Sequence, residues 1–411
     1  MSIAKQGAKT AVPRLRFPEF RKAAAWETKP LSALLDYERP EKYIVANATY
    51  QNSGTPVLTA NKSFILGYTP EVDGVYTGVP VVIFDDFTTD TKYVDFPFKV
   101  KSSAIKILKV KGDDSLKVIF ELMGGIKFEP KEHKRYYISE YQNLKIAIPE
   151  PSEQQKIADC LTSLDEVIAA QGRKVEALKA HKRGLMQQLF PREGETRPRL
   201  RFPEFRDGPE WEVERLAYYV ASLDAGVSVN SGDRPACGDQ IGVLKTSCVA
   251  NGVFDSHENK VVQDSSEIER VKEPVRANTI LISRMNTIAL VGANAFVEKD
   301  APNLFLPDRL WAAKVTPKGH ARFLAYVLGS ERGRAALSGL ASGSSGTMKN
   351  IGKAEVLALQ IYAPSLPEQQ RIADCLSSLD TQITAETNQL TALKTHKQGL
   401  MQQLFLAPEV S

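Results

Sequence analysis

The sequence predicts an α+β protein. We expect two mixed α/β domains separated by two long antiparallel helices, which form an intramolecular coiled coil with pseudo-two-fold symmetry. Three observations lead to this prediction. A 38-residue segment occurs twice, at 153–190 and 368–405, with 25 identities and no gap. Each copy carries a heptad pattern of apolar residues. A longer stretch with strand-like runs precedes each copy, so one structural unit is repeated.

The composition is that of an ordinary soluble protein. The chain has 411 residues, of which 43% are apolar and 25% charged, and a length of this kind suggests two to three domains. The net charge of +4 is compatible with a nucleic-acid partner but argues for one only weakly. The four cysteines form no disulfide framework, the N-terminus lacks a signal peptide, and no apolar run could span a membrane. We therefore expect a cytoplasmic protein that makes no membrane contact.

A second, shorter motif marks the start of each repeat. The sequence of Pro13–Arg21, followed by Trp26, returns as Pro198–Arg206, followed by Trp211. Residues 191–197 join the two repeats as a polar linker. The predicted boundaries, in order, are a disordered arm at 1–12, a first domain at 13–149, a first helix at 150–190, the linker at 191–197, a second domain at 198–362, a second helix at 363–405 and a tail at 406–411.

The two globular segments read as mixed α/β, with little residue similarity between them. In the first, strands are predicted at 79–84, 104–108 and 143–149 and a helix at 115–123. In the second, strands are predicted at 241–245, 278–283 and 356–361, a helix at 322–337 and a loop at 341–347.

Each repeated segment predicts one helix of about 55 Å, at ~1.5 Å per residue. Its apolar residues alternate in spacing between three and four, which gives a narrow seam that a partner helix must cover. We expect the two copies to cover each other. The predicted seam residues are Ile157, Leu161, Leu164, Ile168, Val175, Leu178, Leu185 and Leu189, and then Ile372, Leu376, Leu379, Ile383, Leu390, Leu393, Leu400 and Leu404.

Polar residues interrupt both seams at equivalent positions, Gln171 with Glu386 and Lys182 with Lys397. Polar seam residues often fix the register of a coiled coil, and we interpret them so. The alternative is that they face solvent where the bundle is wide. Capping boxes are predicted at the helix starts, from Ser152 with Gln155 and from Ser365 with Glu368.

The chain shows none of the common catalytic motifs. It has no Pro-Pro dipeptide, which the adenine methyltransferase signature needs, and the segment Gly346–Ala354 does not have the spacing of a phosphate loop. The five histidines lack metal-ligand spacing, and Cys237 and Cys248 lack paired ligands. We find no nucleophile with its base. The sequence therefore favours a binding and scaffolding protein with no catalytic or metal-binding residues.

The order of these motifs resembles a known family. A globular segment, a helix that opens Glu-Gln-Gln-(Lys/Arg)-Ile-Ala and closes Gly-Leu-Met-Gln-Gln-Leu-Phe, a second globular segment and the same helix follow one another. This pattern is similar to the specificity subunit of type I restriction-modification systems, and the resemblance covers essentially the whole chain.

The resemblance implies a division of labour. The globular segments would be target-recognition domains that each read one half of a bipartite site on double-stranded DNA. The helices would be spacers that set the gap and dock two methyltransferase subunits, which carry S-adenosylmethionine and methylate adenine. Restriction subunits, which use ATP and Mg²⁺, would join through that complex and cut unmodified DNA. This chain itself would hold no cofactor and catalyse no reaction. Because the two domains differ in sequence, the target should not be a palindrome.

Base readers are expected among Arg, Lys, Asn and similar residues on loops that reach the major groove. The alternative for each is a phosphate contact or a solvated surface group. The candidates are Asn61, Lys62, Lys92 and Tyr93 in the first domain and Arg284, Asn286, Lys349 and Asn350 in the second.

Two other functions fit the residues less well. One is a coiled-coil adaptor that binds only protein partners, which salt-dependent binding to duplex DNA would exclude. The other is an enzyme with an unfamiliar site in the segment 207–362, which activity of the purified chain alone would support.

Overall fold

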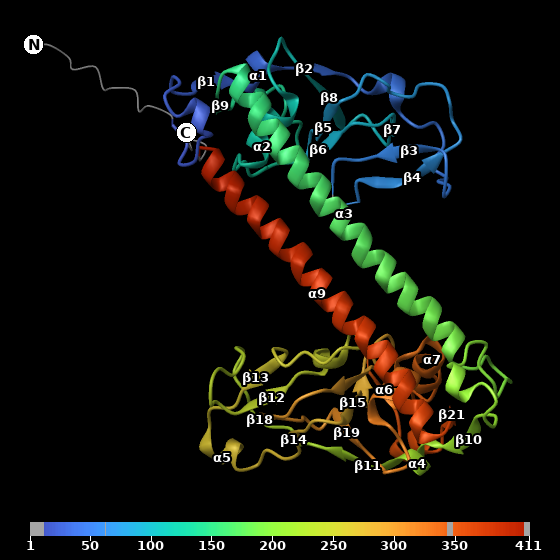
Figure 1. Ribbon diagram of the computed structural model, residues 1–411. Helices are drawn as coiled ribbons and strands as arrows, with labels where there is room; N and C mark the ends of the chain where they lie inside the picture. The colour runs from blue at the N-terminus through green and yellow to red at the C-terminus, as the bar shows by residue number, and fades with distance from the viewer. Residues whose placement is uncertain (1–11, 62, 343–347, 407–411) are drawn as a thin grey trace, which may run out of the picture. The chain divides into compact units, whose positions relative to one another are not determined.

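The chain folds into two compact units, which we describe separately. The computed structural model describes residues 12–61, 63–342 and 348–406. Unit 1 comprises the described residues of 1–173 and 387–411, and unit 2 comprises 174–386. The two long helices, α3 (Pro151–Leu189) and α9 (Leu366–Leu404), each contribute one part to each unit (Figure 1). Their bounds lie within a few residues of the helices predicted at 150–190 and 363–405.

Unit 1 contains two sheets and a short strand pair. The larger sheet is antiparallel, in the order β2 (Leu35–Glu38), β8 (Ile105–Val110), β5 (Val81–Asp85) and β6 (Thr91–Val94). The smaller has the order β4 (Ile65–Thr69), β3 (Thr55–Leu58) and β7 (Lys99–Val100), with β3 and β7 parallel. The pair is β1 (Glu27–Pro30) with β9 (Lys145–Ile148). The helices are α1 (Leu31–Leu34) and α2 (Leu116–Gly124), with 3-10 turns η1 (Pro18–Phe20), η2 (Glu41–Tyr43) and η3 (Tyr141–Asn143).

Helix α2 fixes the core of unit 1. The Ser115 hydroxyl accepts a hydrogen bond from the Val118 N–H and caps the first turn. The buried side of α2 packs with β5 and β8 of the larger sheet. The same cluster takes in Leu161 from α3 and Leu404 from α9. Seam residues at these helix ends therefore belong to the core of the unit as well as to the helix pair.

Unit 2 also contains two sheets. The larger is antiparallel, in the order β11 (Val220–Ala225), β19 (Leu310–Val315), β15 (Thr279–Ser283) and β17 (Asn294–Val297). The smaller has the order β13 (Asn259–Val261), β12 (Gly242–Leu244), β18 (Ala301–Phe305) and β14 (Pro274–Val275), with β12 and β18 parallel. Two short pairs are β10 (Glu212–Arg215) with β21 (Gln360–Ala363), and β16 (Met285–Asn286) with β20 (Lys349–Asn350). The helices are α4 (Leu216–Tyr219), α5 (Ser265–Ile268), α6 (Ala321–Gly329), α7 (Glu331–Gly339) and α8 (Lys353–Leu357), with 3-10 turns η4 (Pro203–Phe205) and η5 (Thr246–Val249).

The two units share one topology despite their dissimilar sequences. In chain order, the strands of the larger sheets correspond as β2 to β11, β5 to β15, β6 to β17 and β8 to β19. In the smaller sheets, β3 corresponds to β12, β4 to β13 and β7 to β18. The parallel pair β3–β7 thus matches the parallel pair β12–β18. Helix α6 follows β19 as α2 follows β8. Repetition therefore extends beyond the two segments that the sequence shows as similar.

Identical contacts hold each unit to its long helices. Arg16 donates to the Glu153 carboxylate through Nε at 2.7 Å and Nη2 at 2.6 Å, and Arg201 does the same to Glu368 at 2.7 Å for both. All four residues are buried.

Gln154 and Gln369, the residues next to these glutamates, are also buried, and each bonds the start of the helix that follows the larger sheet of its unit. The Gln154 side chain accepts from the backbone N–H of Ser115 and the Gln369 side chain from that of His320, the residues that cap α2 and α6. The Glu-Gln pair of the repeated motif is therefore a structural anchor.

The opening segments also close the far ends of the long helices. The Leu200 N–H donates to the Gln188 carbonyl near the end of α3, and the Leu15 N–H donates to the Gln403 carbonyl near the end of α9, both at 2.9 Å. Carbonyls in the last turn of a helix lack partners within the helix. The repeated motif after Pro13 and Pro198 supplies one of them.

Three local predictions are wrong. The helix expected at 322–337 is two helices, because Ser330 takes an extended backbone and its hydroxyl caps α7 at the Gly333 N–H. The strand expected at 356–361 begins as helix α8, and only Gln360–Ala363 forms a strand. The capping box at Ser152 fails because α3 already begins at Pro151 and the Ser152 hydroxyl donates to Glu150. The other predicted box pairs Ser365 with Glu368, and there the Glu368 carboxylate binds the Arg201 guanidinium.

Candidate functional site

Polar residues in the seams join the long helices within each unit. In unit 2, Lys182 of α3 donates to Asp380 of α9 at 2.6 Å, and the Tyr326 hydroxyl of α6 donates to the same carboxylate at 2.7 Å. Lys174 forms an ion pair with Glu386 at 2.6 Å. The partner of each lysine lies on the other helix. These bonds favour the register interpretation over a solvent-facing role.

We call each cluster of polar bonds between the two long helices a seam node. The seam node of unit 1 contains more charged side chains than that of unit 2. Lys397 of α9 donates to Asp165 of α3 at 2.7 Å and to Glu121 of α2 at 3.1 Å, and Lys117 bonds to the same two carboxylates. Burial works to raise the pKa of Asp165, but the bonds from Lys117 and Lys397 outweigh it and hold the pKa below its usual value. This seam node therefore connects α2, which packs on the larger sheet, with both long helices.

Most of the deeply buried seam residues lie toward the ends of the long helices. Ile157, Leu161 and Leu404 lie in the core of unit 1, while Leu189, Ile372 and Leu376 lie in that of unit 2. Val175 is also buried. The remaining seam residues are partly exposed, namely Leu164, Ile168, Leu178, Leu185, Leu379, Ile383, Leu390, Leu393 and Leu400.

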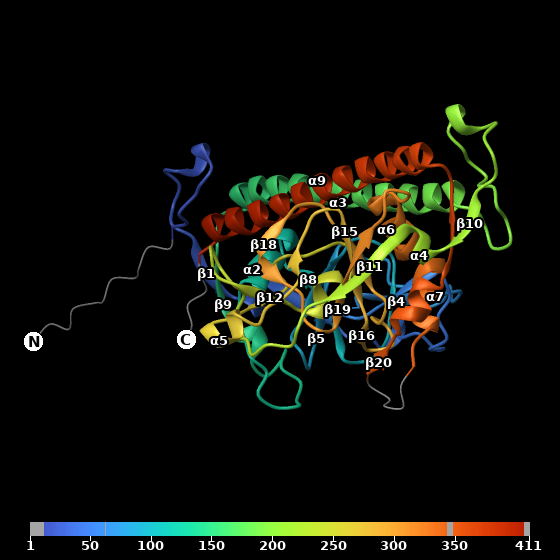
Figure 2. The same cartoon turned by 90° about the horizontal axis from the view of Figure 1, so that it is seen from below.

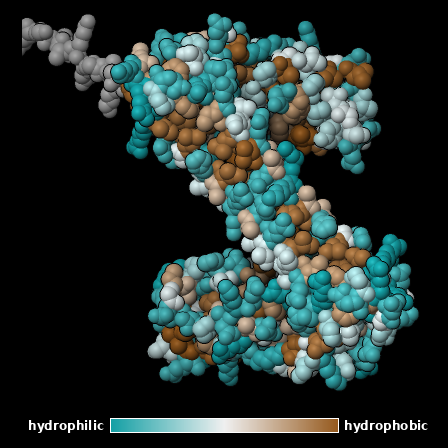
Figure 3. Space-filling view, in the orientation of Figure 1, coloured by the Kyte–Doolittle hydropathy of each residue, from teal (hydrophilic) through white to brown (hydrophobic). Residues whose placement is uncertain are grey.

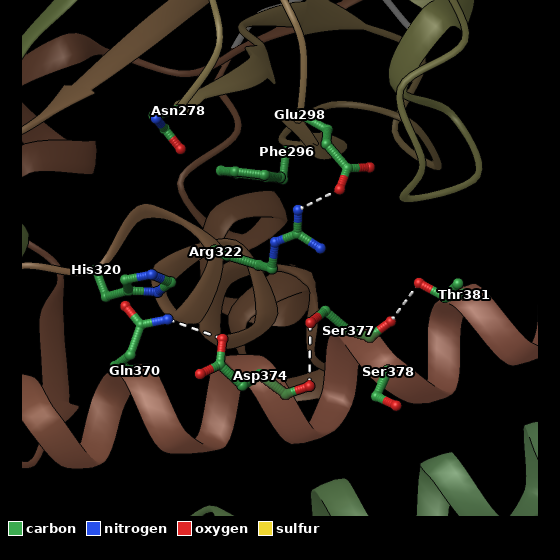
Figure 4. Close-up of a pocket in the computed structure, with 10 residues that line it drawn as sticks. All are labelled: Asn278, Phe296, Glu298, His320, Arg322, Gln370, Asp374, Ser377, Ser378 and Thr381. Atoms are coloured by element: carbon green, nitrogen blue, oxygen red, sulfur yellow. Dashed lines mark hydrogen bonds and ion pairs between the residues drawn. The ribbon is translucent and has the colours of Figure 1, made fainter.

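A polar groove of about 500 Å³ lies in unit 2 between α9 and the sheet domain (Figure 4). Its helix wall presents Gln370, whose amide donates to Asp374 at 2.8 Å. On the opposite wall, Arg322 lies over the Phe296 ring and donates to Glu298 at 2.8 Å. Such a groove suits a polar or charged protein surface better than an apolar small molecule.

Unit 1 repeats the two walls of this groove. Gln155 of α3 donates to Asp159 at 2.7 Å, and both residues are exposed like their equivalents on α9. Lys117 lies 5.3 Å from the Tyr93 ring centroid. The exposed Gln155–Asp159 pair therefore matches the Gln370–Asp374 pair in residue type, spacing and hydrogen bond.

Each larger sheet ends in the same backbone arrangement, which we call the end bracket. In unit 1, the Asp86 N–H donates to the Ala104 carbonyl at 2.8 Å, and the Asp86 carbonyl accepts from the Tyr136 N–H at 2.9 Å. In unit 2, the Arg284 N–H donates to the Arg309 carbonyl, and the Arg284 carbonyl accepts from the Ile351 N–H, both at 3.0 Å. Asp86 and Arg284 thus hold equivalent positions.

The side chains of the two end brackets differ completely. The buried Asp86 pairs with the buried Lys106 at 3.2 Å. The strand position equivalent to Lys106 is Trp311, and the Arg284 guanidinium lies 5.5 Å from a Trp311 ring centroid. Figure 2 shows β5 in unit 1, and β16 and β20 in unit 2, away from the long-helix part of the same unit. The end brackets therefore point away from the anchor of each unit.

The structure brings all four candidate residues of the second domain together at the end bracket of unit 2. Met285 pairs with Asn350 and Asn286 with Lys349 in the short β16–β20 ladder. Asn286 is buried, and its amide serves the turn by bonding the Ser283 hydroxyl and the Thr287 N–H. Arg284 Nε and Asn350 Oδ1 are buried and have no hydrogen-bond partner among the residues that the structure describes.

The candidate residues of the first domain are dispersed. Asn61 lies in the turn between β3 and β4, where its carbonyl accepts from the Phe64 N–H, and Lys62 lies outside the described residues. Lys92 faces Ile83 across the β5–β6 ladder. Tyr93 packs against Phe120 of α2, and burial raises the pKa of its hydroxyl. The strand that precedes the turn of Asn61 bonds the segment before β8, through the Lys101 N–H and the Leu58 carbonyl.

Sequence reasoning missed the end bracket of unit 1. Its residues come from three segments far apart in the chain, and Asp86 and Tyr136 carry no pattern that links them. The signal that could have revealed them is the shared topology, because the position of Arg284 transfers to Asp86 once β15 is matched with β5.

The described residues also bear on metal binding and on membrane contact. Among residues 12–61, 63–342 and 348–406, no group of three or more His, Cys, Asp or Glu side chains could hold a metal ion. None of the helices in these ranges combines the length and apolarity needed to cross a membrane. The faces of both units drawn in Figure 3 mix hydrophilic and hydrophobic residues. Strongly exposed apolar side chains such as Val72, Val253 and Ile288 come from separate loops.

The fold is similar to solved type I restriction-modification subunits. The S subunit of the type I restriction-modification system from M. genitalium matches with a TM-score of 0.63 at 14% identity, covering 96% of this chain and 99% of that one. A chain from a structure on complex assembly and conformational transition of the type I R-M system gives a TM-score of 0.50 at 15% identity, covering 92% and 97%.

The sequence comparisons agree with the fold. The family model described as the type I restriction modification DNA specificity domain matches residues 248–395. The MjaVIII specificity subunit of Methanocaldococcus jannaschii is 24% identical, covering 64% of this chain and 62% of the relative. The Escherichia coli EcoR124I/EcoR124II specificity subunit is 30% identical over 376 residues, which are 86% of this chain and 87% of the relative. The protein therefore belongs to the family of type I restriction enzyme specificity subunits.

Proposed function

We propose that each unit reads one half of an asymmetric bipartite sequence on double-stranded DNA. The observation that carries this proposal is the end bracket, which has the same backbone bonds in both units and different side chains. A common scaffold with different readers suits two half-sites of different sequence. The recognition domains comprise 13–149 and 198–362, and the linker 191–197 joins the first helix to the second domain. The chain itself is the non-catalytic subunit.

We further propose that α3 and α9 pair as an antiparallel intramolecular coiled coil with pseudo-two-fold symmetry. Three observations support the pairing. Lys182 bonds across to Asp380, Lys397 bonds across to Asp165, and seam residues of both helices share the core of each unit. A paired helix of this length would hold the two reading domains at a fixed separation, as the geometry of a dimer fixes the spacing of its half-sites.

The exposed Gln–Asp pairs of the long helices support docking of two methyltransferase subunits, one at each repeat. Gln155 with Asp159 and Gln370 with Asp374 present the same acceptors in both repeats, and the groove in Figure 4 adjoins the second pair. In this arrangement, S-adenosylmethionine is bound by the methyltransferase subunits. The restriction subunits, with ATP and Mg²⁺, join through that complex. Carboxylates of this kind would bind Arg or Lys side chains of a partner.

The gap between the half-sites tests the proposal that the helices set their separation. Inserting one heptad into each long helix adds about 10 Å at ~1.5 Å per residue, or up to about 3 base pairs at ~3.4 Å each. Methylated adenines mapped after the insertion should show the same two half-sites with a longer gap. An unchanged gap, in a complex that still methylates, would contradict the proposal. As a control, seven exposed residues of each long helix are substituted without changing its length. This control shows whether altered docking, without a longer helix, changes the methylation pattern.

A further inference from the structure

The end bracket of unit 1 carries a preorganised basic and aromatic platform. The Phe87 and His133 rings stack with their centroids 4.7 Å apart and their planes 12° apart. The Arg135 guanidinium lies 5.9 Å from the Phe87 centroid, and its Nη2 donates to the Ser103 hydroxyl at 3.4 Å. These residues come from the turn after β5, the turn before β8 and the connection after α2. All three segments meet at Asp86, whose N–H and carbonyl join them.

Buried aromatic residues hold this loop in place. Phe128 packs edge-on against Tyr136 and Tyr141 of the core. The buried Tyr136 hydroxyl bonds the Glu132 backbone at 2.7 Å, and the Tyr137 N–H donates to the Asp86 carboxylate at 2.8 Å. The loop 127–135 is therefore tied at its start, at its middle and just after its end. A side chain on such a loop loses little conformational freedom on binding.

The loop is also basic, and its charge is exposed. Residues 127–135 contain four Lys or Arg and two Glu, with His133 in addition. Lys131, His133 and Arg135 are exposed. Within the described part of the chain, neither a hydrogen bond nor an ion pair holds Lys131. In Figure 2 the connection after α2 projects from the side of its unit that is away from the long helices.

Resting on the proposed function, we propose that Arg135, whose guanidinium lies over the Phe87 ring, reads a base in the half-site of unit 1. The Tyr136 and Ile351 N–H groups bond equivalent carbonyls, so Arg135, just before Tyr136, corresponds to Asn350 in the end bracket of unit 2. In that bracket Arg284 lies against Trp311. Arg presents a planar fork that matches the O6 and N7 acceptors of guanine in the major groove, and stacking on a ring fixes the plane of that fork. Lys131, which lacks a fixed geometry, contacts phosphate and does not distinguish bases.

The test uses the full chain in its methyltransferase complex. Methylated adenines are mapped in a host that lacks other such systems, for the unaltered chain and for Arg135→Ala, Arg135→Lys and Lys131→Ala. We expect both Arg135 variants to lower discrimination at one base pair of one half-site by roughly tenfold to a hundredfold, with the other half-site unchanged. Lys131→Ala removes the same charge from the same loop. It should lower methylation at all sites alike and leave the sequence preference intact.

Two results would overturn the inference. One is a uniform loss of methylation in Arg135→Ala with no change in sequence preference. The other is an equal relaxation by Lys131→Ala. Melting curves of the purified complexes verify that the variants fold, and His133→Ala provides a second, milder variant that should relax the same base pair. If the unaltered chain directs methylation to no bipartite sequence, the proposed function fails. If it does so and the Arg135 variants leave that sequence unchanged, only this inference fails.

Discussion

The end brackets of the two units have the same backbone bonds but very different side-chain chemistry. In unit 1 the central position is Asp86, buried and paired with the buried Lys106. In unit 2 it is Arg284, partly exposed and placed against Trp311. The anchors to the long helices are the opposite case, since Arg16 with Glu153 and Arg201 with Glu368 match in residue type, bonds and burial.

The comparison separates what is constant from what varies. The anchors and the Lys–Asp bonds between the long helices are constant, because both domains pack on one repeated helix. The side chains at the end brackets vary. A protein that reads two different half-sites needs this combination, in which the scaffold repeats and the readers do not. Four changes should break or sharpen the comparison, and we order them by expected effect.

The largest effect should come from the anchors. Glu153→Gln and Glu368→Gln each leave a buried arginine without its charged partner, which costs about 3–5 kcal/mol when a buried pair is broken. The two losses should be similar, each confined to its own unit, and visible as lost hydrogen-exchange protection together with a lower denaturation midpoint. Glu204→Gln, which alters the exposed pair with Arg371, provides the control and should change neither measurement. Clearly unequal losses would show that the anchors are not equivalent.

The second effect concerns base reading by unit 2. Arg284→Ala should lower discrimination at one base pair of one half-site by about 1–3 kcal/mol. The other half-site and the gap should be unchanged. Asp86→Asn, at the equivalent position of unit 1, should alter stability and leave sequence preference intact, because Asp86 is buried. Methylation of DNA substrates that carry single base changes measures both, and relaxation of both half-sites by Arg284→Ala would refute separate readers.

The seam nodes should differ in strength. Lys397→Ala removes bonds to Asp165 and to the buried Glu121 and should cost unit 1 about 1–2 kcal/mol. Lys182→Ala should cost unit 2 less than about 1 kcal/mol, because Asp380 is partly exposed and keeps its bond from Tyr326.

The pH dependence of unit 1 checks this assignment. The folded pKa of Asp165 lies below its unfolded value, so its contribution is present above the unfolded pKa near 4 and is lost as the pH falls through the folded pKa. In Lys397→Ala, the free energy of unfolding of unit 1, measured by urea titration, should therefore fall less as the pH is lowered. The Lys182→Ala variant of unit 2 serves as the reference, and an equal reduction in both would count against the assignment to Asp165.

The smallest effect should come from the helix caps. Ser115 caps α2 and His320 caps α6, where the His320 Nδ1 accepts from the Phe323 N–H. Burial lowers the pKa of His320 below its ordinary value. Protonation of the unfolded chain therefore weakens unit 2 as the pH falls below about 6.5, down to the folded pKa.

His320→Ser, which copies the cap of unit 1, should remove this dependence. The cap itself contributes roughly 1 kcal/mol, and serine at this position should keep it. Melting of the two chains at pH 7.5 and 5.5 measures it, and an unchanged pH dependence in the variant would contradict the role of His320.

The sequence alone predicted the long helices, because their signal is local and periodic. Of the predicted seam residues, Ile157 and Leu404 lie in one core, while others such as Leu164 and Leu390 are partly exposed. The short strands around Val82 and Ile280 were also predictable, as apolar runs between turn residues. The common topology of the two units was not, because it depends on strand pairing between distant segments with dissimilar residues.

The candidate readers show the same division. Arg284 and Lys349 were named as separate candidates, one after a predicted strand and one after a predicted loop, and the short β16–β20 ladder brings their segments together. Tyr93 was expected in a turn-rich stretch, but it lies in strand β6 and its ring packs against Phe120 of α2. Phe87, His133 and Arg135 come together only through tertiary backbone bonds at Asp86, which no local pattern reveals.

The most direct test of the central claim is a map of methylated adenines in a host with this chain, without it, and with the Arg284→Ala variant. The account predicts a bipartite sequence that disappears when the chain is removed. In the variant, one half-site should relax while the other half-site and the gap stay the same. Methylation of the same bipartite sequence in a host that lacks the chain would contradict the account, and so would a variant in which both half-sites relax together.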